Sequence, residues 1–199
     1  MISQTQPTAY SSIRQDVLTS KYTSNQVKRN LSLGGILPIL LYGCETWCLT
    51  ESLLDQLRNW YNKKLREMCR ITLFQSWQYH ISNTDLQSRL NIQSIDFYIA
   101  SRTLRWLGHV IRMPLYRLPR LILTSWIQNP RPTGAPLMTY GRTINKHLRF
   151  FGLPTAVSDW ATVASDRPHW RSLISKPPHP DVTSPHQPTT PAPPFTANP

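Results

Sequence analysis

The chain has 199 residues, of which 40% are hydrophobic, so it is long enough for one domain with a real core. Its 22 Lys and Arg against 10 Asp and Glu give a formal charge of +12, which favours an anionic partner. Nucleic acid ranks first and an acidic membrane surface second, and the alternative is a solvated basic surface with no specific partner. The longest apolar run, 36–42, is far shorter than the ~20 residues of a membrane-spanning helix, so we expect no membrane partner.

Three cysteines, an odd number with no signal peptide before them, indicate an intracellular, reduced protein and do not distinguish nucleus from cytoplasm. Cys44, Cys48, Cys69 and His80 are the residue types that bind zinc. Their spacing is irregular, however, and Cys69 falls on the apolar side of a predicted helix, where a free thiol packs well. We therefore expect no metal and no cofactor.

The two ends of the chain differ in composition from its middle. Residues 1–20 are polar and predicted to be flexible, and residues 176–199 form a proline-rich tail that is predicted to be disordered. The folded part is therefore 21–175. Strand-like alternation is scarce there, so the fold class is mainly α, a small helical domain with amphipathic basic helices.

The first apolar segment, 36–42, favours a helix that Gly43 ends, although a strand stays open. A strongly amphipathic helix comes next, with Thr50 or Ser52 as its cap. Lys63, Arg66 and Arg70 share its basic side. Its apolar side comprises Leu53, Leu57, Trp60, Tyr61, Leu65, Met68 and Ile71. Residues 82–92 predict a short capped helix.

The next helix begins after Ser94 as cap and ends at Pro114. Ile95, Ile99, Trp106 and Val110 form an apolar stripe, which Leu107 and Ile111 widen. A separate arc of roughly 80° holds its cationic side chains, with Tyr98 among them. The arc consists of Arg102, Arg105, His109, Arg112 and Tyr98. This helix is thus predicted to pack on one side and present cations on the other.

A third helix of this kind begins after Thr139 and is closed by Gly152 and Pro154. Its apolar side comprises Tyr140, Ile144, Leu148 and Phe151, and its basic side comprises Arg142, Lys146 and Arg149. Beyond it, Trp160 and Trp170 should dock back on the domain because both are large and apolar. Asp166 and Arg167 are expected to cap or pin the turn before the last helix.

Carboxylates are missing from a long central stretch. No Asp or Glu occurs between Phe97 and Ser158, whereas nine Lys or Arg do (Arg102, Arg105, Arg112, Arg117, Arg120, Arg131, Arg142, Lys146 and Arg149). Two-metal nucleotidyl transfer needs clustered carboxylates, and there is no Asp-Asp pair, phosphate-binding glycine loop or nucleophile elbow. His109 has no nucleophile or carboxylate with which to act as a base. We therefore expect a binding protein and not an enzyme.

Basic helix faces bind phosphates without reading sequence, so the predicted partner is RNA and/or DNA. Aromatic side chains among the cations could stack on unpaired bases. Tyr98 is the better candidate for stacking, whereas Trp60 and Trp106 are favoured as core residues. The predicted nucleic-acid-binding residues are Tyr98, Arg102, Arg105, His109, Arg112, Lys63, Arg66, Arg70, Arg142, Lys146 and Arg149.

An ordered set of short motifs carries a resemblance over about residues 20–175. The motifs are LPILLYGCETW (37–47), REMCRI (66–71), RTLRWLGHVIRMP (102–114), RLPRLIL (117–123), NPRPTGAPLMTYGRTINKHL (129–148) and WATVASDRPHWRSLI (160–174). In this order they resemble the carboxy-terminal part of the endonuclease–reverse transcriptase polyproteins of non-LTR retrotransposons. The matching segment of that family is the end of the thumb and the region carboxy-terminal to the thumb.

The resemblance implies a role in holding template RNA, primer or target DNA near a polymerase domain that lies upstream in the family. That missing domain is a second expected partner. No catalytic residue of the family can be placed on this sequence, so a truncated or decayed copy of an element without function is one alternative. A helical protein-interaction module that docks an acidic partner is another.

Overall fold

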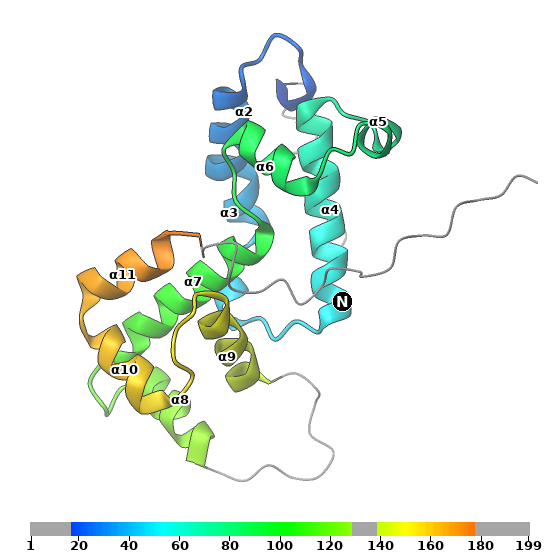
Figure 1. Ribbon diagram of the computed structural model, residues 1–199. Helices are drawn as coiled ribbons and strands as arrows, with labels where there is room; N and C mark the ends of the chain where they lie inside the picture. Colours follow the sequence, from blue (N-terminus) through cyan, green and yellow to red (C-terminus); the bar gives the residue numbers. More distant parts are fainter. Residues whose placement is uncertain (1–16, 129–138, 178–199) are drawn as a thin grey trace, which may run out of the picture.

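The computed structural model describes residues 17–128 and 139–177, and within them every regular element is helical (Figure 1). The mainly α prediction is confirmed. The predicted disorder of the proline-rich tail falls on residues outside the described ranges, apart from its first two positions. The helices are α2 (Asn25–Leu31), the π-helical η1 (Ser32–Ile36), α3 (Leu37–Leu40), the 3-10 turn η2 (Cys44–Thr46), α4 (Glu51–Cys69), α5 (Leu73–Gln78), α6 (Asn83–Leu90), α7 (Ile95–Ile111), α8 (Leu118–Gln128), α9 (Tyr140–Phe150), α10 (Val157–Ser165) and α11 (Arg167–Ser175).

Two hydrophobic clusters build the core. The first joins α3, α4, α6 and the start of α7, and the second joins the remainder of α7 to α8, α9, α10 and α11. Figure 1 shows α7 running between these two groups of helices. The first cluster also buries Leu18, so the segment 1–20 that was predicted to be flexible includes a core residue.

α7 is buried on most of its circumference, which corrects the two-faced prediction. Besides the expected stripe, the helix buries Ala100, Ser101, Thr103, Leu104 and Gly108. The reason is tertiary, because α9, α10 and α11 all pack against the same helix. Only a narrow strip of α7 is left for solvent.

The predicted caps are confirmed where the structure describes them. Thr50, and not Ser52, caps α4, and Ser94 caps α7 by accepting from the Phe97 N–H at 3.2 Å. Thr139 caps α9, and Asp166 caps α11 by accepting from the His169 N–H at 3.2 Å. Each cap satisfies an N–H group that the first turn of a helix leaves without a partner.

The inner face of α4 is rotated from the predicted one. Leu54 is 6% exposed, whereas Leu53 and Trp60 are 39% and 38% exposed. Leu54 falls in one arc with Tyr61 and Leu65, while Leu53 and Trp60 fall about 100° to one side. The core assignment of Trp60 is therefore wrong. Trp106 is half-buried and packs edge-on against Tyr140 with 6.0 Å between ring centroids, as a core residue would.

Polar contacts tie the first group of helices together. Arg58 of α4 donates to both carboxylate oxygens of Asp96 on α7, with the shortest distance 2.6 Å. Lys28 is buried, and its Nζ donates to the Met68 carbonyl oxygen at 2.8 Å, in the last turn of α4. A cation is favourable there because the unpaired carbonyl groups give the carboxyl end of a helix a partial negative charge.

No described helix is both long and apolar enough to cross a bilayer.

Candidate nucleic-acid interface

The cationic arc predicted on α7 is divided between exposed and structural residues. Arg105 and His109 are exposed, whereas Arg102 and Arg112 are half-buried. Arg102 donates to the Leu41 carbonyl oxygen at 3.2 Å, and Arg112 donates to the Ala164 carbonyl oxygen at 2.6 Å. Both acceptors lie at helix carboxyl ends, where guanidinium groups stabilise carbonyls that have no partner in the helix.

Tyr98 is engaged within the fold. It is half-buried, its hydroxyl oxygen accepts from the Gln93 N–H at 3.0 Å, and its ring meets Phe97 edge-on at 5.5 Å. Burial raises the pKa of the Tyr98 hydroxyl. A ring fixed in this way is a poorer candidate for stacking on a base than an exposed ring.

The other predicted residues lie on separate surfaces. Lys63 and Arg70 of α4 are exposed and Arg66 is half-buried; on α9, Arg142 and Arg149 are exposed. Lys146 of α9 forms an ion pair with Glu51, in the first turn of α4.

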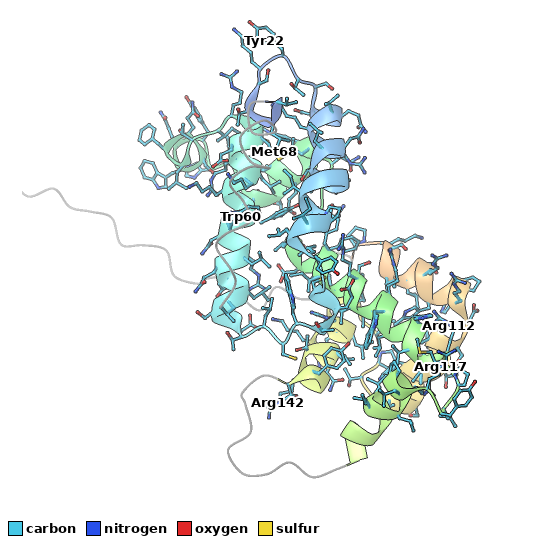
Figure 2. All side chains as sticks on the ribbon, turned by 180° about the vertical axis from the view of Figure 1, so that it is seen from behind. Tyr22, Trp60, Met68, Arg112, Arg117 and Arg142 are labelled. Atoms are coloured by element: carbon cyan, nitrogen blue, oxygen red, sulfur yellow. The ribbon has the colours of Figure 1, made fainter. Side chains whose placement is uncertain are left out.

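Glu51 and Arg70 lie at opposite ends of α4, about 28 Å apart at 1.5 Å per residue. The α9 cations therefore do not continue those at the carboxyl end of α4. Figure 2 shows the same separation, with Arg142 in one half of the molecule and Met68 in the other. The predicted residues do not form one site.

The structure instead brings α11 alongside α7. Trp170 of α11 donates from Nε1 to the Leu104 carbonyl oxygen at 2.9 Å, and the Ser101 hydroxyl donates to the Ile174 carbonyl oxygen at 2.9 Å. Along α11 the chain runs from Trp170 to Ile174, while their partners on α7 run backwards from Leu104 to Ser101. The two helices are therefore antiparallel. Arg167, at the start of α11, consequently lies toward the end of α7 that carries Arg112.

This packing brings Arg167 and Arg171 near Arg112. Arg105 and His109 share the predicted arc of α7 with Arg112 and are exposed. We call Arg105, His109, Arg112, Arg167 and Arg171 together the α7–α11 basic surface. Sequence reasoning missed Arg167 and Arg171 as binding residues, although their i, i+4 spacing after the Asp166 cap indicates a shared helix face.

Positive charge is not compensated on this surface. Burial lowers the pKa of the Arg112 guanidinium, and the nearby charges of Arg167 and Arg171 lower it further. Within 17–123 and 139–177, no carboxylate lies within 4.0 Å of a charged nitrogen of Arg105, Arg167 or Arg171. Guanidinium groups in such a position suit phosphate oxygens, which they can bind in bidentate fashion.

The three cysteines are free and do not assemble with His80. Cys44 is buried, Cys69 is half-buried and Cys48 is exposed. Burial, with a smaller contribution from Glu45, raises the pKa of the Cys44 thiol to about 11, so it stays protonated at neutral pH. In the part of the chain that the structure describes, no three His, Cys, Asp or Glu side chains are grouped to hold a metal ion.

Comparison with known proteins shows a similarity to a transposon-derived protein. An uncharacterized transposon-derived protein of Caenorhabditis elegans is 26% identical to this chain over 163 residues, which is 79% of this chain and 57% of that protein. The chain thus spans little more than half the length of this relative. No protein-family model matches the chain, and no solved structure matches it. The similarity indicates a transposon-related origin for the chain.

Proposed function

We propose that this chain binds RNA and/or DNA without sequence specificity, through phosphate contacts of the α7–α11 basic surface. The observation that carries the proposal is the gathering of Arg112, Arg167 and Arg171 with no carboxylate paired to Arg167 or Arg171 among the described residues. Like charges held together by the fold repel one another. The attraction of a bound phosphate to these cations offsets their mutual repulsion. Binding also releases counterions from the nucleic acid.

The extent of the surface favours a polyanion over a single small anion. Arg105 and Arg112 are seven residues apart on α7, which is about 10 Å along the helix. Arg167 and Arg171 add a second row of cations on α11. Groups spread over that length can contact several successive phosphates of one strand.

The parent protein in this proposal is a non-LTR retrotransposon reverse transcriptase, of which this chain is a carboxy-terminal fragment. Its support is the ordered set of motifs between residues 37 and 174, together with the similarity to a transposon-derived protein. In this account the chain binds nucleic acid and has no polymerase activity of its own. The upstream polymerase domain of such a protein would be a further partner.

The proposal is tested by fluorescence anisotropy with a labelled 20-nucleotide RNA, the same sequence as single-stranded DNA, and its duplex. We expect binding to all three, with an affinity that falls steeply as salt rises. The expected slope of log affinity against log salt is about 0.7 per phosphate contact on single strands and about 0.9 on duplex DNA. No binding at low salt would overturn the proposal. Displacement of the RNA by polyglutamate more readily than by unlabelled RNA would overturn it as well and would indicate an acidic protein as the partner.

A further inference from the structure

α5 presents large apolar side chains to solvent. Leu73, Phe74, Trp77 and Tyr79 are 71%, 67%, 74% and 65% exposed. No residue of this helix is buried, and Figure 1 shows α5 projecting beside the end of α4. We call these four residues the α5 aromatic patch. Leu73, Phe74 and Trp77 line one shared hollow, and exposed apolar side chains gathered in this way mark interaction sites in folded proteins.

Local hydrogen bonds hold the patch in place. Thr72 and Gln75 form a capping box, in which each side chain satisfies a backbone N–H of the other residue. The Ser76 hydroxyl donates to the Ile81 carbonyl oxygen at 2.8 Å and fixes the return of the chain. The helix is thus ordered by its own polar contacts, and its aromatic rings are free to meet a ligand.

A cation borders the patch. Arg70 precedes α5, is exposed and has a positive φ of 56° where the chain turns from α4. The acids nearest in sequence are engaged elsewhere. Glu67 pairs with Lys64 at 2.7 Å, and Asp85 accepts from the Ser82 N–H at 2.9 Å in the capping box of α6.

We propose that the α5 aromatic patch stacks on the bases of single-stranded RNA or DNA, with Arg70 contacting the adjoining phosphate. Aromatic rings with cations at their edge are the composition of single-strand binding surfaces. The Phe74 and Trp77 ring centroids are 6.3 Å apart and tilted by 40°, so these rings are not stacked on each other. This inference rests on the proposed function and adds a preference for single strands, since bases inside a duplex are already stacked.

The test compares the full chain with the double variant Phe74→Ala/Trp77→Ala on three probes. These are a 20-mer of thymidylate, an abasic 20-mer with the same phosphates, and a duplex. We expect affinity for the thymidylate probe to fall by about tenfold for each ring removed. Affinity for the other two probes and the salt slope should stay unchanged, as should the melting temperature, because neither ring is buried.

Two control variants sharpen the result. Tyr42→Ala removes an aromatic side chain that is 86% exposed and lies outside the patch, so it should bind every probe as the unmodified chain does. Trp77→Phe keeps a stacking ring and should retain most of the affinity.

The results distinguish failure of the stacking proposal from failure of the proposed function. If the unmodified chain binds with the expected salt dependence and the double variant binds thymidylate equally well, the stacking proposal is overturned and the proposed function stands. If the unmodified chain binds no probe, both are overturned. If the double variant instead turns a dimer into a monomer in sedimentation, the patch is a contact between copies of this chain and the stacking proposal is overturned.

Discussion

Gly108 and Trp170 approach so closely that no larger residue fits at position 108 without a shift. A Cβ atom added to Gly108 would lie 2.4 Å from the indole Nε1 and 2.7 Å from Cδ1. The indole is 1% exposed and held by its hydrogen bond to the Leu104 carbonyl oxygen, so it has little room to move. This contact brings α11 against α7 and thereby creates the α7–α11 basic surface.

Gly108→Ala should therefore destabilise the protein, although alanine favours helix formation by about 1 kcal/mol over glycine. Overpacking of a core costs about 1–3 kcal/mol, and displacement of the indole would also weaken its hydrogen bond, worth about 1 kcal/mol. We expect a net loss of about 1–3 kcal/mol in the free energy of unfolding, measured by urea denaturation.

Gly141→Ala on α9 is the matched control, since a Cβ there meets nothing within 4 Å. This variant should be unchanged or stabilised by up to about 1 kcal/mol. If Gly108→Ala is as stable as Gly141→Ala, the close contact between α7 and α11 does not exist in solution.

His147 on α9 makes stability depend on pH. Burial, helped by the neighbouring charge of Lys146 and opposed by Asp96, lowers the pKa of this imidazole to about 4. The unfolded chain protonates it near pH 6.5, so protons favour the unfolded state as the pH falls from about 6.5 to 4. We expect a loss of about 2 kcal/mol between pH 7 and pH 5, a range in which carboxylates stay largely ionised.

The measurement is urea denaturation of the unmodified chain and of His147→Gln at both pH values. Glutamine does not titrate, so the variant should lose much less stability between pH 7 and pH 5. Equal losses in the two proteins would mean that another group causes the pH dependence.

Arg102 and Arg112 should behave as structural residues. Each donates a charge-assisted hydrogen bond to a carbonyl oxygen of another helix end, which glutamine is too short to replace. Arg102→Gln or Arg112→Gln should therefore lower the free energy of unfolding by about 1–2 kcal/mol. Arg105→Gln, at an exposed position, should change it by less than about 0.5 kcal/mol. Equal stability of all three variants in urea denaturation would contradict these roles.

Local features were predictable from the sequence. The caps at Thr50, Ser94 and Thr139 depend on a side chain and an N–H group three residues later, so the pattern alone indicates them. The docking of Trp160 and Trp170 was also predictable, since both are 2% exposed or less and the cost of leaving such side chains in water is large.

Partners distant in the chain were not predictable. Arg102 donates to the carbonyl oxygen of Leu41, 61 residues earlier, and Arg112 donates to that of Ala164, 52 residues later. A helical wheel places both in one arc with Arg105 but cannot tell which of the three another helix covers. The same limit concealed Arg167 and Arg171, whose neighbourhood with Arg112 exists only because α11 turns back along α7.

The central claim is that exposed cations of the α7–α11 basic surface contact phosphates. Its most direct test is the salt dependence of binding by the variant Arg105→Gln/Arg167→Gln/Arg171→Gln, measured on single-stranded and duplex probes. A control that removes the same charge from other surfaces is Lys63→Gln/Arg89→Gln/Arg149→Gln.

If each of the three arginines contacts one phosphate, the slope of log affinity against log salt should fall by about 2 on single strands and by about 2.7 on duplex DNA. The melting temperature should be unchanged, because all three side chains are exposed, and the control variant should keep most of the slope. An unchanged slope in the first variant, or an equal fall in the control, would contradict the account.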